Sequence, residues 1–146
     1  MNHPPKNATR TGSCLCGDIR FEISADPMFG GFCQCHDCQR QTGTGHASAM
    51  GFPESAVKIA GQPTYYVSKA GSGATVRRGF CPRCGSRLVF ASSGMPGMVL
   101  VSPGVFDDQS LFKPEVVVFA AHGQTWDHLD PALARFPEMP PPRKQA

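Results

Sequence analysis

The stretch Cys81-Pro82-Arg83-Cys84-Gly85 has the composition of a metal-binding turn. A spacer of two residues lets one tight turn direct both cysteine sulfurs at a single zinc ion. Pro82 fixes φ early in such a turn, and Gly85 can adopt the positive φ that leaves backbone N–H groups free to bond thiolates. A redox pair or buried free thiols would be other uses of this spacing. We interpret the stretch as a zinc knuckle, which supplies two of the four ligands that zinc prefers.

Two more cysteine groups lie upstream and bring the total to seven. They are the pair Cys14-x-Cys16 and the group Cys33-x-Cys35-x-x-Cys38. Three sulfurs within six residues form a natural local triad, so we expect the second group to act as a unit. The first pair would then complete the site that the knuckle begins.

The number of ligands predicts a different chemistry for each site. Four thiolates close the coordination shell of zinc, which is the pattern of a structural site. Three protein ligands leave a fourth position for water or substrate, which is the catalytic pattern. A second partition remains open at this point, in which Cys35 and Cys38 join Cys81 and Cys84 in an ordinary zinc ribbon. That partition leaves the other three cysteines without a metal.

Several neighbours of the triad have both a functional and an ordinary interpretation. His36 and His46 are possible fourth ligands, although a surface or hydrogen-bonding role is the commoner one for a histidine. Arg40 could bind an anionic group or hold the loop. The segment Gly43-Thr44-Gly45 could bring backbone to a substrate or form an ordinary turn. We place Trp126 in the core, because tryptophan is more often a core residue than a ligand contact.

Length and composition favour one globular domain. The chain has 146 residues, 40% of them hydrophobic and 17% charged, and no apolar run long enough to cross a bilayer. Its formal net charge is +3 with scattered basic residues, which argues against nucleic acid as a partner. The odd number of cysteines and the lack of a secretory signal indicate a cytoplasmic metalloprotein. We expect a flexible leader over residues 1–11, one domain over 12–140 and a tail over 141–146.

The pattern of apolar residues predicts a mainly β fold. Residues 18–23 alternate between apolar and polar side chains, as a half-buried strand does. Helix signals are weak, and we expect only single turns at residues 110–112 and 130–135, the second with Asp130 as N-cap and Pro131 at its first position. Five further strands are expected at residues 57–59, 64–67, 88–90, 98–101 and 116–119.

At this point the motifs resemble a known family. Residues 12–17 (GSCLCG), 33–40 (CQCHDCQR) and 80–85 (FCPRCG) resemble the glutathione-dependent formaldehyde-activating enzyme family, which includes the centromere protein V domain. The likeness extends over about residues 10–140, including WDHLD at 126–130 and FPEMP at 136–140.

The resemblance implies an Mss4-like fold, a β-tent of antiparallel sheets with zinc-binding knuckles. It also implies two zinc ions per chain. The implied ligands are Cys14, Cys16, Cys81 and Cys84 for the structural ion, and Cys33, Cys35 and Cys38 for the second. Many members have histidine where this chain has Gln34, and Arg-Arg where it has Gln39-Arg40. These departures leave metal binding intact and leave the thiol substrate open.

The function implied is that of a carbon–sulfur lyase acting on a thiol adduct such as S-hydroxymethylglutathione, formed from glutathione and formaldehyde. The small-molecule thiol is the expected partner, the three triad cysteines are the catalytic candidates, and His36, His46 and His128 are candidates for acid–base work. One alternative is a non-catalytic zinc-ribbon-like module that binds protein or nucleic acid. Another is a thiol redox or metal-buffering role. Exposed β-edges make a homodimer plausible.

Overall fold

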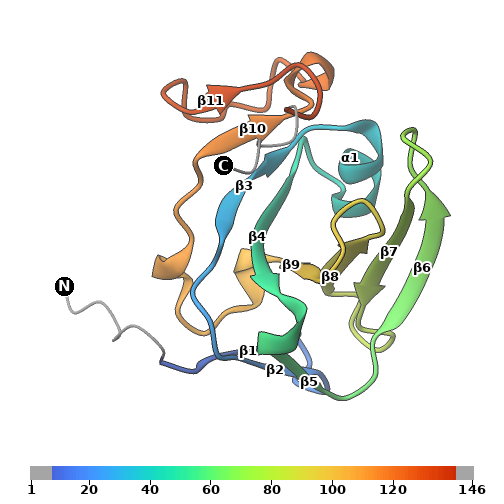
Figure 1. Ribbon diagram of the computed structural model, residues 1–146, viewed down its shortest axis with the longest axis vertical. Helices are drawn as coiled ribbons and strands as arrows, with labels where there is room; N and C mark the ends of the chain where they lie inside the picture. Colours follow the sequence, from blue (N-terminus) through green and yellow to red (C-terminus); the bar gives the residue numbers. More distant parts are fainter. Residues whose placement is uncertain (1–7, 141–146) are drawn as a thin grey trace. The chain divides into compact units, whose positions relative to one another are not determined.

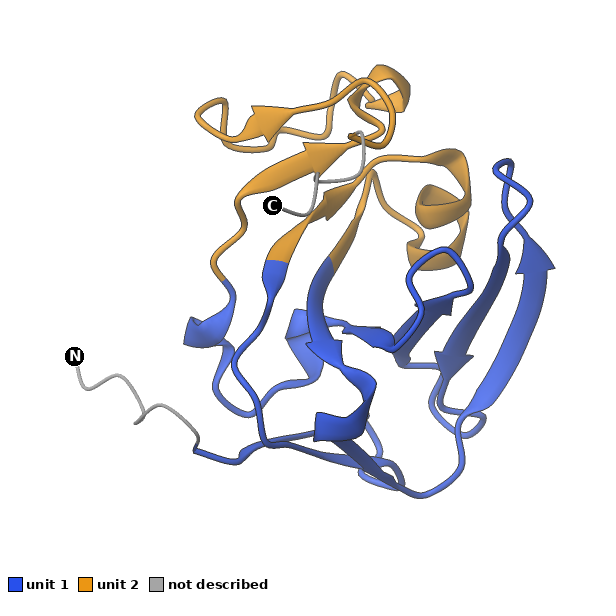
Figure 2. Ribbon diagram, in the orientation of Figure 1, with its two compact units in different colours: residues 1–29, 49–112 blue, residues 30–48, 113–146 orange. Residues whose placement is uncertain are grey.

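The computed structural model describes residues 8–140, and their fold is mainly β, as the sequence predicts (Figure 1). The described strands form two sheets, one of three and one of eight strands, accompanied by one short α-helix. No helix in this part of the chain is long and apolar enough to span a membrane. The chain divides into two compact units, residues 1–29 with 49–112 and residues 30–48 with 113–146 (Figure 2).

The predicted leader and tail are only partly covered by the structure. The leader lies outside the described residues as far as position 7, and the tail, residues 141–146, lies outside them entirely. The first strand begins at Arg10, so the last two residues of the predicted leader, Arg10 and Thr11, belong to this strand. The extent of one domain over residues 12–140 stays a prediction.

The first unit contains the three-stranded sheet, in the order β1-β2-β5 and antiparallel throughout. Its strands are β1 (Arg10–Ser13), β2 (Arg20–Ile23) and β5 (Val57–Ala60). In β2, Phe21 and Ile23 are buried while Arg20 and Glu22 are exposed. The alternation predicted for this strand is therefore confirmed, since side chains along a strand point to opposite faces in turn.

Five strands of the larger sheet lie in the first unit, apart from the first two residues of β4, and have the antiparallel order β4-β9-β8-β7-β6. They are β4 (Ala47–Pro53), β9 (Met98–Val101), β8 (Arg87–Ser92), β7 (Thr75–Phe80) and β6 (Thr64–Lys69). The short helices η1 (Glu54–Ala56), η2 (Pro103–Val105) and η3 (Gln109–Leu111) connect parts of this unit. The core of the unit includes two cysteines, Cys14 and Cys81, among its buried apolar side chains.

The second unit has three strands that pair in parallel, in the order β11-β10-β3. They are β3 (Phe29–Cys33), β10 (Val116–Val118) and β11 (Ala134–Arg135). The helix α1 (His36–Thr42) follows β3, and the short helix η4 (Ala120–His122) follows β10.

Two helix predictions have opposite outcomes. The single turn expected at residues 110–112 is confirmed in position by η3. The turn of helix expected at 130–135 is wrong, because residues 131–133 form a non-helical turn and Ala134 and Arg135 join β11. Asp130 accepts a hydrogen bond from the backbone of Ala132, as an N-cap would, but here its side chain supports a turn between two extended segments.

Candidate metal centres

Four cysteines of the first unit bring their sulfurs together. The Sγ atoms of Cys14, Cys16, Cys81 and Cys84 all lie within 4.8 Å of one another. Those of Cys14 and Cys16 are 3.5 Å apart, and those of Cys16 and Cys81 are 3.7 Å apart. Tetrahedral zinc with bonds of about 2.3 Å to sulfur would separate its ligands by about 3.8 Å. The spacing and the all-sulfur donor set therefore fit zinc.

Backbone hydrogen bonds hold both turns of this group. The N–H of Ile19 donates to Cys14 Sγ at 3.3 Å. In the knuckle, Gly85 has a φ of +79° and its N–H donates to the carbonyl oxygen of Cys81 at 2.8 Å. This is the conformation that the sequence predicts for Gly85, and it is strained for other residues. Cys14 and Cys81 are buried, so the group is closed to solvent on that side.

The remaining three cysteines form a group of their own in the second unit. The Sγ atoms of Cys33, Cys35 and Cys38 lie within 4.8 Å of one another. Cys33 ends β3, Cys35 is the N-cap of α1 and Cys38 lies in its first turn, where its N–H donates to Cys35 Sγ at 3.3 Å. The seven cysteines thus group as four and three, and the zinc-ribbon partition is not formed.

The three-cysteine group has no fourth ligand within the same distance among the described histidine, cysteine and acidic side chains. His46 does not close it, because neither of its ring nitrogens lies within that distance of the three sulfurs; its Nδ1 bonds to Asp127 at 2.9 Å. His36 stacks on the ring of His122, with centroids 4.6 Å apart. Neither histidine is therefore a fourth ligand of this group.

The thiols within each group shift one another's pKa. Hydrogen bonds from the Cys33 and Cys38 thiols lower the pKa of Cys35 to about 2, and the pKa of Cys33 is raised by its bonds to Cys35 and Cys38 and by burial. In the other group, bonds from Ser86 lower the pKa of Cys84 to about 5. A backbone hydrogen bond from Asp18 lowers the pKa of Cys16, but burial and the neighbouring thiols outweigh it and raise this pKa to about 12.

These pKa shifts predict proton release on metal binding. Cys16 and Cys33, whose pKa values are raised, keep their protons at pH 7, and a zinc ligand must be a thiolate. Each group should therefore release at least one proton when it is loaded at pH 7, and its affinity for zinc should fall as the pH falls. Calorimetry in buffers of different ionisation enthalpy measures the number of protons released per zinc ion bound. Loading without proton release would contradict the assignment.

A buried polar network includes a residue of the three-cysteine segment. Gln34, between two of the cysteines, is 6% exposed and donates from Nε2 to Asp127 Oδ2 at 3.0 Å. The side chain of Asp127 is only 8% exposed and also accepts from His46. A Cβ at Gly45 would lie 2.4 Å from Asp127, and one at Gly123 would lie 2.7 Å from Gln34. Glycine at these two positions makes room for the network.

Sequence reasoning missed the role of Asp127. Its only signal was its place in the motif WDH, next to a tryptophan that was assigned to the core. That assignment is wrong, because Trp126 is 60% exposed. Asp127, anchored to His46 and Gln34, is the inward-facing residue of this turn, and the indole beside it is left on the surface.

Replacing Asp127 with asparagine should loosen the three-cysteine group. The asparagine amide would keep one acceptor oxygen and place an N–H donor where the other oxygen of Asp127 accepts from Gln34 or His46. We expect unfolding free energy to fall by about 1–3 kcal/mol and the zinc affinity of this group to fall about 10–100-fold. Urea unfolding and chelator competition measure both. Asp26→Asn, which weakens only a surface ion pair with Arg10, is the matched control. If Asp127→Asn has the same free energy of unfolding and the same zinc affinity as the wild type, the network does not support the three-cysteine group.

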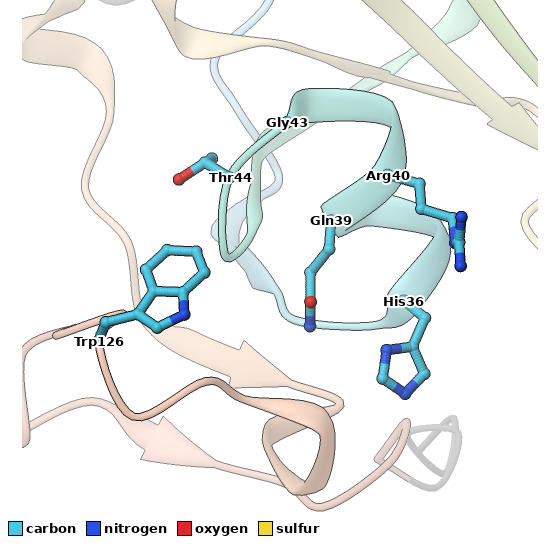
Figure 3. A pocket seen from close by; sticks show the side chains of 6 residues that line it. All are labelled: His36, Gln39, Arg40, Gly43, Thr44 and Trp126. Atoms are coloured by element: carbon cyan, nitrogen blue, oxygen red, sulfur yellow. The ribbon is translucent and has the colours of Figure 1, made fainter.

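An open pocket of about 370 Å³ lies on the exposed side of α1. Figure 3 shows His36, Gln39 and Arg40 projecting from the helix, with Thr44 at its end and Trp126 across from them. Gln39 is tied to the protein, because its Nε2 donates to the carbonyl oxygens of Gln34 at 2.8 Å and His122 at 3.0 Å. Arg40, His36 and Trp126 are exposed.

Comparison with known proteins gives one family. A family model described as "Glutathione-dependent formaldehyde-activating enzyme" matches residues 9–122. Among solved structures, the crystal structure of a Rhodobacter sphaeroides protein, a structural genomics target, is 20% identical with a TM-score of 0.55. The match covers 71% of this chain and 96% of that chain, and at this identity it shows the fold alone. None of the curated proteins compared with the chain matches it.

Proposed function

This chain belongs to the glutathione-dependent formaldehyde-activating enzyme family, and from this premise we propose that it is a zinc-dependent carbon–sulfur lyase. Its substrate would be a thiol adduct such as S-hydroxymethylglutathione. In the direction of synthesis, the glutathione sulfur forms a bond to the carbon of formaldehyde, the C=O double bond becomes a single bond, and the thiol proton ends on oxygen. The observation that carries the proposal is the three-cysteine group without a fourth ligand.

Both cysteine groups have the chemistry of zinc ligands. Soft thiolates favour zinc over magnesium or calcium. Cys14, Cys16, Cys81 and Cys84 would hold a structural ion, and Cys33, Cys35 and Cys38 would hold a second ion with one position left for substrate. Bound there, zinc would act as a Lewis acid that favours the thiolate form of a thiol at neutral pH.

The protein's own groups supply charge balance and proton transfer. Three thiolates make the group strongly negative, and the N–H of Cys38 offsets part of this charge by donating to Cys35. Of the three candidate histidines, His36 is the best placed to carry the proton between sulfur and oxygen. It follows Cys35 directly, is exposed and lines the pocket, whereas His46 is not among the residues that line it.

The proposal is tested by following ¹³C-formaldehyde and glutathione by NMR, after counting zinc per chain. Zinc-loaded protein should raise the rate of adduct formation above the uncatalysed rate, and chelator-stripped protein should not. A rate equal to that of buffer, with two zinc ions bound per chain, would discard glutathione and formaldehyde as substrates.

The alternative of a non-catalytic binding module has one observation in its favour. Tyr66 is exposed on β6, and the guanidinium of Arg77 lies 4.4 Å from the ring centroid of Tyr65. Aromatic and basic side chains together are typical of surfaces that bind single-stranded nucleic acid. Saturable binding of a labelled single-stranded RNA, lost in Tyr66→Ala and without any adduct formation, would favour this role over the enzyme.

A further inference from the structure

We propose that the pocket beside α1 binds a carboxylate-bearing arm of the thiol substrate, with Arg40 as the anion-binding group. The inference rests on the proposed function, whose thiol substrate carries carboxylates. It also assigns a specificity residue to a place that carries none of the cysteine ligands.

The position of the pocket relative to the cysteines follows from the helix. Pocket residues Gln39 and Arg40 lie three and four positions after His36, so these residues share one face of α1. Cys35 is the N-cap of the same helix. Arg40 is five positions after Cys35, which is about 7.5 Å along the helix axis. The three-cysteine group and the backbone of Arg40 are thus about one and a half helical turns apart, a separation that a peptide thiol with a carboxylate remote from its sulfur can span.

The charges in the pocket favour an anion. Arg40 has no hydrogen bond or ion pair with any residue in the described part of the chain, so its charge is available to a ligand. No carboxylate is among the residues that line the pocket. The three thiols nearby would repel an anionic arm once ionised, so an acidic substrate requires a cation at some distance from them. A guanidinium can bind a carboxylate with two hydrogen bonds, which makes arginine well suited to this task.

The other walls of the pocket give the arm a surface to pack on. Trp126 offers an exposed indole across from the helix, and its neighbour Asp127 is fixed by His46 and Gln34. Gln39 has both donors of its amide directed at backbone carbonyls, so it shapes the wall rather than competing for the ligand. Selection therefore depends on Arg40 for charge and on Trp126 for apolar contact.

The test uses S-methylglutathione, which keeps both carboxylates but cannot form a thiolate. Its binding reports on the pocket, whether or not the protein catalyses the reaction. We expect saturable binding in calorimetry to the zinc-loaded protein and at least a 10-fold loss of affinity in Arg40→Ala, the size expected for a hydrogen bond to a charged group. Arg40→Lys should recover part of the affinity. Arg20→Ala, which removes an exposed arginine of β2, should bind as the wild type does.

Kinetics separate this inference from the proposed function. If Arg40 binds the carboxylate, Arg40→Ala should raise KM for glutathione by about the factor by which it weakens binding of S-methylglutathione. It should leave KM for uncharged 2-mercaptoethanol unchanged. Equal affinity of Arg40→Ala and wild type for S-methylglutathione would overturn the subsite, even if adduct formation proceeds. Loss of S-methylglutathione binding in Arg40→Ala would support the subsite, even if no adduct forms and the proposed function fails.

Discussion

Cys35→Ser is expected to abolish adduct formation and to remove one of two bound zinc ions while the protein stays folded. Cys35 is the sulfur that accepts from both other thiols of its group and from the N–H of Cys38. Serine is among the best N-cap residues, so its hydroxyl can take over the capping bond that the sulfur makes to α1. The substitution therefore removes a metal ligand without removing the helix cap. Zinc analysis measures the loss of one ion, NMR measures adduct formation, and circular dichroism shows whether the protein stays folded.

Asp37→Ser is the matched control for this variant. It changes an exposed residue in the first turn of the same helix, which belongs to neither cysteine group. It should keep both zinc ions and most of the activity. If Cys35→Ser unfolds, or keeps two zinc ions and full activity, the division into one structural and one reactive group is wrong.

Cys81→Ser should have the larger effect on stability. Cys81 is 1% exposed and lies in the hydrophobic core with Cys14, so this group supports both the knuckle and the packing of the first unit. Structural zinc in small sites contributes about 10–16 kcal/mol of apparent binding free energy, while whole domains are stable by only about 5–15 kcal/mol. Loss of one thiolate should therefore leave most of the protein unfolded at 37 °C.

Thermal unfolding and zinc content measure this outcome. The control is Arg83→Ala, in the same turn, which removes only an exposed ion pair with Asp18 at 3.0 Å and should cost less than about 1 kcal/mol. A Cys81→Ser protein that melts with the wild type would mean that the four-cysteine group is not structural.

Sequence reasoning predicted six of the eleven described strands and the grouping of the cysteines. Both depend on local patterns: alternation at residues 20–23 places Phe21 and Ile23 inside, and a two-residue spacer with Gly85 after it forms a knuckle in which that glycine has a positive φ. The joining of the first pair to the knuckle was an expectation from counting ligands, and the sulfurs do lie together.

The features that were missed depend on contacts between distant residues. Helix α1 has only seven residues, too few for a hydrophobic period to be visible, and it is defined at its ends by Cys35 and Gly43. Asp127 lies 93 residues from Gln34 and 81 from His46, so its network could not be read from spacing. The same holds for β11, whose parallel pairing with β10 turns an expected helical segment into a strand.

The central claim is that the three-cysteine group holds a metal ion with one position open to an external thiol. Titration of the cobalt-loaded protein with glutathione, followed by thiolate-to-metal charge-transfer absorption, tests it most directly. We expect a saturable rise in absorption as an additional sulfur joins the three cysteines, and no rise in Cys35→Ser. A spectrum that does not change on addition of glutathione, with two cobalt ions bound per chain, would contradict it.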